Sequence, residues 1–290
     1  MWLLFLADAA AIFVTYSRLP PRELYHVSHG GLAGGASRVL VFSNFPTALA
    51  ATAVLLVLAD RARSRVRAAA AVLGIGLCAA VFYPGVVDQA NLDAKPVNAV
   101  AAAGVVIALV LSAAEGRPAS PGRRPGDGAR IGVAAVAAFI ALPWIAAELG
   151  FFLDGVPVLG RVFVTGKYLR TLPGLPPFPP AVHHGHHHGL DGTLLLLGAL
   201  LLSRVVPTLR HRALRVLAGA YLALTACYGI GNIANDAWTE QVWKRHWSSW
   251  QFPDVLRPSA TVAWAVIVLG AAALYAAAAW WSGRVRVPDV

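Results

Sequence analysis

Long apolar runs alternate with short polar segments along the whole chain. Runs of roughly 17–25 apolar residues are long enough to cross a hydrocarbon core of about 30 Å as α-helices. The pattern therefore predicts an all-α, polytopic integral membrane protein, a helical bundle with about eight transmembrane helices in one domain. The predicted spans are Trp2–Ser17, Val39–Ala59, Ala68–Val86, Asn98–Ala114, Ile131–Phe152, Thr193–Pro207, Ala213–Ala234 and Thr261–Trp281.

Two of these runs allow a second interpretation. The first could be a secretory signal, but no basic segment precedes it, Asp8 lies in its middle and no small-residue cleavage site follows. We therefore interpret it as a span. The sixth is short after Gly192, and it reaches full length only if its helix begins near His183.

The basic residues predict the orientation. Four connecting or terminal segments hold 14 of the 24 Lys and Arg residues in a small part of the chain, with Arg61, Arg63, Arg65 and Arg67 as the tightest group. By the positive-inside rule these segments are cytoplasmic, which places both termini in the cytoplasm and the protein in the plasma membrane. The long loop 153–192 and the loop 235–259 are then on the outer side.

The composition supports this class and limits the partners. Hydrophobic residues make up 58% of the chain and charged residues 13%, about half the usual charged share. The net charge of +10 is explained by arginines beside membrane helices that face anionic headgroups, so we expect membrane lipids and no nucleic acid as partners. Cys78 and Cys227 lie inside apolar runs and indicate core packing.

The segment 181–193, AVHHGHHHGLDGT, carries the densest candidate chemistry. It follows a proline-rich run, and a helix can begin just after Pro180. Such a helix would place three imidazoles and a carboxylate on one of its faces, because these residues stand at positions i, i+3, i+4 and i+7. The predicted face consists of His184, His187, His188 and Asp191, with His183 and His186 beside it.

Several imidazoles with a carboxylate are ligands that suit a divalent transition metal (Zn, Fe or Cu) better than Mg or Ca. Two other interpretations stay open. The histidines can form a solvated tract that binds metal only weakly, or they can act as a pH-sensitive gate.

Other polar residues are expected to face this segment. His26 and His29 in the first outer loop would complete the metal site. Glu148 near the end of the fifth span, Asp236 at the end of the seventh and Asp8 in the first are acids at membrane depth, where ionisable groups usually face a cavity, a partner or an ion path. We assign Glu148, Asp236 and Asp191 as catalytic candidates. The alternatives are a neutral helix–helix contact for Asp8 and Glu148, and a helix cap for Asp236.

The loop 235–259 contains Trp243, Trp247 and Trp250 at helical spacing. This spacing predicts a short amphipathic helix at the membrane surface, with the indoles at headgroup level. The alternative is a lid over the polar chamber, to which His246 contributes.

The residues His183-x-x-His186-His187, and equally His184-x-x-His187-His188, resemble the H-x-x-H-H box of membrane desaturases and hydroxylases. Those families use several such boxes around two irons. The resemblance covers a single box and implies a shared ligand chemistry.

Three functions are compatible with this sequence. The first is a metal-dependent membrane enzyme, an oxidoreductase or hydrolase, that acts on a lipidic or apolar substrate. The second is a transporter or permease-like protein that binds metal or protons at its outer mouth. The third is a structural membrane subunit with an incidental His tract.

Overall fold

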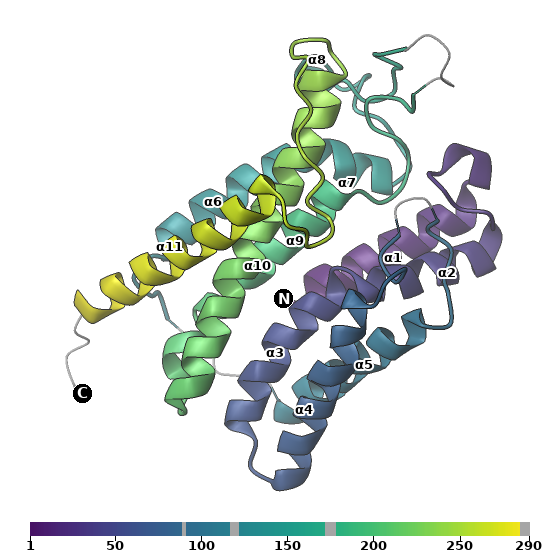
Figure 1. The fold of residues 1–290 in the computed structure, drawn as a ribbon. Helices are drawn as coiled ribbons and strands as arrows, with labels where there is room; N and C mark the ends of the chain where they lie inside the picture. Colours follow the sequence, from purple (N-terminus) through teal and green to yellow (C-terminus); the bar gives the residue numbers. More distant parts are fainter. Residues whose placement is uncertain (89–90, 117–121, 172–177, 285–290) are drawn as a thin grey trace.

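The structure, a computed structural model, describes residues 1–88, 91–116, 122–171 and 178–284. Every regular element in these ranges is a helix, so the all-α prediction is confirmed there (Figure 1). Much of the proline-rich run before the histidines, part of the basic segment after Glu115 and the end of the C-terminal tail lie outside these ranges.

Between five and seven helices of the described part are long and apolar enough to cross a membrane, which is consistent with a membrane protein. The upper number counts each of two bent pairs of helices as one span. The five unbroken ones are α4 (Arg65–Cys78, extended by a 3₁₀ turn, Ala79–Phe82), α5 (Asn98–Glu115), α9 (His188–Ser203), α10 (Arg212–Trp238) and α11 (Val262–Arg284).

The two bent pairs correspond to the second and fifth predicted spans. α2 (Gly31–Asn44) and α3 (Thr47–Arg61) meet at 48°, and α6 (Asp127–Ile140) and α7 (Leu142–Glu148) meet at 56°. A proline lies at each break, where it removes one backbone hydrogen bond from the helix. The remaining predicted span is α1 (Trp2–Arg18), which has 17 residues. The predicted count of eight spans and the cytoplasmic termini stay predictions.

The helices form two groups that meet along the middle of the molecule. The first group is α1 to α5, which pack on one another (Figure 1). In the second group α9 packs most extensively on α10, and α11 also packs on α10. The groups touch where α3 contacts α9 and α10 and where α1 contacts α7. Residues from α1, α7 and α9 therefore come together at this junction.

Three of the four basic segments gather at one end of the bundle. The Asp60 carboxylate accepts hydrogen bonds from the backbone N–H groups of Arg210 and His211, both at 2.8 Å. Nε of Arg204 lies 3.2 Å from a carboxylate oxygen of Asp127. These contacts support the grouping on which the predicted orientation rests, since segments on one side of a membrane must share one end of the bundle.

Candidate metal centre and the buried histidines

The segment 181–187 is an extended strap. The N–H groups of Ala181, Val182 and Gly185 donate to the carbonyls of Lys167 (2.7 Å), Thr165 (3.1 Å) and Ala147 (3.0 Å). These bonds to other parts of the chain replace the internal bonds of a helix. Helix α9 therefore begins only at His188, and the prediction of a helix that starts just after Pro180 is wrong.

Gly185 is required by the geometry of this strap. Its φ is +101°, a backbone conformation that L-residues with a side chain rarely adopt. A Cβ at this position would lie 2.5 Å from the hydroxyl oxygen of Tyr16. The same hydroxyl accepts a hydrogen bond of 3.2 Å from the backbone N–H of His186, so the close approach fixes the next residue of the strap.

His186 is the centre of a buried group of acids. Its Nδ1 contacts Oε2 of Glu148 and lies 3.7 Å from Oδ2 of Asp8. One ligand atom from each of these three residues lies within 4.8 Å of the other two, so this group could hold a metal ion. His186 and Glu148 are 4% and 2% exposed, and the Asp8 side chain is 9% exposed. Helix α1, helix α7 and the strap each supply one member.

Asp191 holds the ring of His186 from the opposite side. Oδ1 of Asp191, in the first turn of α9, lies 2.5 Å from Nε2 of His186. A carboxylate that accepts the N–H of one ring nitrogen directs the lone pair of the other nitrogen toward a metal. Burial alone would lower the pKa of His186, but Asp191, Glu148 and Asp8 together raise this pKa well above its ordinary value.

His187 belongs to a second buried pair. Its Nε2 donates to the carbonyl of His183 at 2.9 Å, and its Nδ1 lies 3.2 Å from Oε1 of Glu240. Since both ring nitrogens face acceptors, this geometry favours the ring that is protonated at both nitrogens. The indole N–H of Trp144 donates to Oε2 of Glu240 at 2.6 Å. Burial lowers the pKa of His187, but Glu240, Asp236 and the carbonyl of His183 together more than offset this effect, so the pKa is raised.

This pair explains why the loop 235–259 differs from its prediction. Helix α10 continues through a π-helical turn, Thr239–Trp243, and Glu240 and Trp243 are buried. Lys244 follows and donates to the carbonyls of Pro180 (3.0 Å) and Ala181 (3.3 Å). The segment predicted as a separate surface helix is therefore partly the end of α10. Trp247 and Trp250 are exposed, as an interfacial position requires.

His183 and His184 make aromatic contacts. The ring of His183 stacks between Tyr25, at 4.6 Å, and His187, at 4.0 Å. The ring of His184 stacks on Phe152 at 4.1 Å. Burial and the neighbouring His187 lower the pKa of His183 well below its ordinary value. Neither ring belongs to the group around His186.

The other predicted site residues lie around the cluster. His29 is on the surface, 3.6 Å from Asp93, and His26 packs its ring against Tyr25. His188 Nδ1 lies 3.5 Å from Oδ2 of Asp191. Asp236 accepts the N–H of Gly189 at 2.6 Å and thereby caps the first turn of α9. Of the seven histidines predicted as ligands, only His186 is in the described group of three.

Trp144 and Glu240 are absent from the predicted site, although Glu240 faces His187 and Trp144 donates to Glu240. Asp8 was expected near the histidines, but not as a ligand. The position of Asp8 in an apolar run is an available signal, because such acids usually have a function. No sequence pattern relates it to positions 148 and 186. Glu240 lies in a segment whose tryptophan spacing predicts a surface helix, so its burial could not be anticipated.

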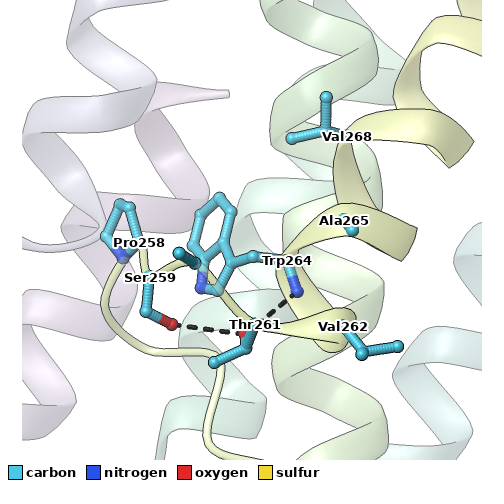
Figure 2. A pocket seen from close by; sticks show the side chains of 8 residues that line it. Pro258, Ser259, Thr261, Val262, Trp264, Ala265 and Val268 are labelled. Carbon is cyan, nitrogen blue, oxygen red and sulfur yellow. Dashed lines mark hydrogen bonds between the residues drawn. The ribbon is translucent and has the colours of Figure 1, made fainter.

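A surface groove of about 850 Å³ lies at the start of α11, away from these residues. Figure 2 shows Pro258, Trp264 and Val268 along it, and the Thr261 side chain accepts the backbone N–H of Trp264. No titratable side chain lines this groove. The groove therefore offers hydroxyl groups but no acid or base.

No protein-family model, curated protein or solved structure matches this chain.

Proposed function

We propose that this protein is a metal-dependent membrane enzyme in which Asp8, Glu148 and His186 hold one divalent transition-metal ion. The observation that carries the proposal is a buried carboxylate oxygen of Asp8 that has no hydrogen-bond partner. Oδ2 of Asp8 is buried without a hydrogen-bond partner and lies 3.7 Å from Nδ1 of His186. A buried carboxylate oxygen without a partner costs free energy, and a cation between these atoms would remove that cost.

The charges agree with this assignment. Asp8, Glu148 and Asp191 surround a single imidazole. When all three carboxyl groups are ionised, even a protonated His186 leaves an excess of negative charge in a buried place. A divalent ion compensates most of it. Two carboxylates and one imidazole suit Zn²⁺ or Fe²⁺ better than Cu²⁺. In this proposal Glu148 and Asp191, both expected as catalytic residues, act otherwise: Glu148 is a metal ligand and Asp191 positions His186.

The ligands are held in place by neighbouring contacts. The hydroxyl of Thr15 donates to the carbonyl of Glu148, and a guanidinium nitrogen of Arg18 donates to the carbonyl of Leu149 at 3.2 Å. Both bonds join α1 to the end of α7. Three protein ligands leave coordination positions open, which is typical of catalytic rather than structural metal sites. A metal bound there supplies Lewis acidity that polarises a substrate oxygen or activates water.

A lipidic or apolar substrate is supported by the surroundings of the group. Leu4 lies one helical turn before Asp8 and is 38% exposed, and Ile145 lies one turn before Glu148 and is 37% exposed. Both side chains face outward on the apolar surface of helices α1 and α7. An apolar surface of this kind next to the group is what a substrate dissolved in the membrane would contact. We place the protein in the plasma membrane with the His-rich segment on the outer side.

Metal analysis of the purified protein tests the proposal. We expect about one Zn or Fe per chain by plasma mass spectrometry, retained through dialysis. Asp8→Asn, Glu148→Gln and His186→Gln should each lose it, and Asp191→Asn should weaken binding by about 10- to 100-fold. Glu23→Gln and His29→Gln, at exposed positions, are the matched controls.

Two results would contradict the proposal. One is a folded wild-type protein without metal. The other is metal that exchanges freely and is lost on replacing His184 and His188, because weak binding along the His tract is what the transporter and incidental-tract alternatives predict.

A further inference from the structure

Arg38, on α2, is a buried cation without a counterion. The residue is 4% exposed, and its Nε is buried without a hydrogen-bond partner. Its guanidinium lies over the ring of Tyr16, 5.7 Å from the ring centre. In the described part of the chain no carboxylate lies within ion-pair distance of it. A buried arginine normally pairs with an anion, because its charge and its five N–H donors are costly to leave unmatched.

Arg38 lines a cavity of about 20 Å³, the size of one water molecule or one oxygen of a larger anion. His188 lines it as well, and its Nδ1 makes no hydrogen bond. Most of the other lining residues are apolar, but Asp88 and Asp191 also line the cavity, and Val87 and Asp88 are partly exposed. The apolar part of the wall consists of Val41, Phe45, Val86, Leu92 and Leu256.

The two acids that line this cavity each have a basic partner. Oδ2 of Asp88 lies 2.9 Å from Nζ of Lys95. Asp191 contacts His186 through one oxygen and faces His188 with the other. Arg38 therefore supplies an uncompensated positive charge at the cavity. A water molecule makes only about three hydrogen bonds and has no net charge, so it cannot balance this cation.

We infer that Arg38 and His188 form a binding site for an oxyanion, a phosphate or carboxylate group, that enters beside Val87 and Asp88. One oxygen of the anion occupies the cavity and accepts hydrogen bonds from the guanidinium. The rest of the anion lies outside the cavity, beside the partly exposed Val87 and Asp88, so the group can belong to an anionic lipid, while free phosphate presents the same chemistry. The site adjoins the Asp8–Glu148–His186 group through Asp191, but none of those three residues lines the cavity, so its metal is not part of the anion site.

Binding of named probes to the full-length protein in detergent tests this inference. Inorganic phosphate should raise the thermal midpoint of the wild type. Native mass spectrometry in phosphatidylcholine micelles should show retained phosphatidic acid. Retention of the lipid without an effect of phosphate identifies a lipid headgroup, and an effect of phosphate without lipid retention identifies a soluble anion.

Arg38→Gln should weaken the binding of whichever probe binds by at least about tenfold, since a hydrogen bond to a charged group contributes about 1.5–3 kcal/mol. Arg22→Gln, at an exposed position, should bind like the wild type. Metal content should be unchanged in Arg38→Gln and lost in His186→Gln, which separates failure of this inference from failure of the metal site. Should Arg38→Gln not fold, His188→Gln replaces it. The inference is wrong if neither probe binds the wild type, or if these variants bind as well as it does.

Discussion

The indole N–H of Trp144 donates to Oε2 of Glu240 at 2.6 Å, although the two residues lie 96 positions apart. Trp144 is 1% exposed and belongs to α7, while Glu240 belongs to the π-helical extension of α10. The other oxygen of Glu240 faces His187, 3.2 Å away. One carboxylate thus joins two helices to the His-rich strap.

Glu240→Gln should destabilise the protein by about 1.5–3 kcal/mol. The amide keeps an acceptor for the indole of Trp144, but it removes the charge that balances His187. The measurement is the free energy of unfolding in detergent, with Glu23→Gln as the exposed control. Equal stability of the two variants would show that Glu240 does not compensate a charged His187.

Contact between α9 and α10 depends on two facing glycines. A Cβ on Gly229 would lie 2.5 Å from the carbonyl oxygen of Gly192, and the reverse distance is also 2.5 Å. Small residues let membrane helices approach this closely. Gly229→Ala should therefore cost about 1–3 kcal/mol, as overpacking does.

The control for this substitution is Gly132→Ala on α6, where a Cβ would meet nothing within 4 Å. It should be neutral or stabilising by up to about 1 kcal/mol, because alanine favours the helix more than glycine does. Thermal unfolding of both variants compares them directly. Equal melting temperatures would refute the close contact.

The apolar pattern was sufficient to find the helices but insufficient for their bends. Pro46 and Pro143 are visible in the sequence, and each lies at a break. The angle at a break depends on the neighbours: Asn44, for example, donates from Nδ2 to the carbonyls of both Leu40 and Asn98 at 2.8 Å. Such contacts join distant positions, and hydrophobic periodicity carries no information about them.

The candidate site was predictable only in part, for a similar reason. Histidine density drew attention to the strap, and His186, Glu148 and Asp191 do lie together. Local spacing, however, favoured a helix at 181–187, and backbone bonds to residues 147, 165 and 167 override it. Because the strap is not helical, the rings of consecutive histidines point to different neighbours. His186 then meets Asp8 and Glu148, while His187 meets Glu240.

Asp236 allows a test of whether its hydrogen bond or its charge stabilises the start of α9. Its carboxylate accepts the N–H of Gly189 at 2.6 Å. Asp236→Asn keeps an acceptor and should leave stability nearly unchanged, whereas Asp236→Ala should lose about 0.5–2 kcal/mol, the usual contribution of a helix cap. Chemical denaturation of both variants measures this difference. If Asn is as harmful as Ala, the negative charge of Asp236 matters more than its hydrogen bond.

His183 should make the protein less stable at acidic pH. Burial and the charge on His187 hold the pKa of His183 well below its ordinary value, so the folded protein favours the neutral ring. The unfolded chain takes up this proton near pH 6.5, at about the ordinary pKa. The stabilisation from a neutral His183 is therefore complete above that pH and is lost as the pH falls toward the lowered pKa. Melting temperatures at about pH 7.5 and 5.5 should fall less for His183→Gln than for the wild type. His29→Gln, whose side chain is 69% exposed in the native protein, should fall as the wild type does. An equal fall in all three proteins would show that His183 takes up no additional proton on unfolding.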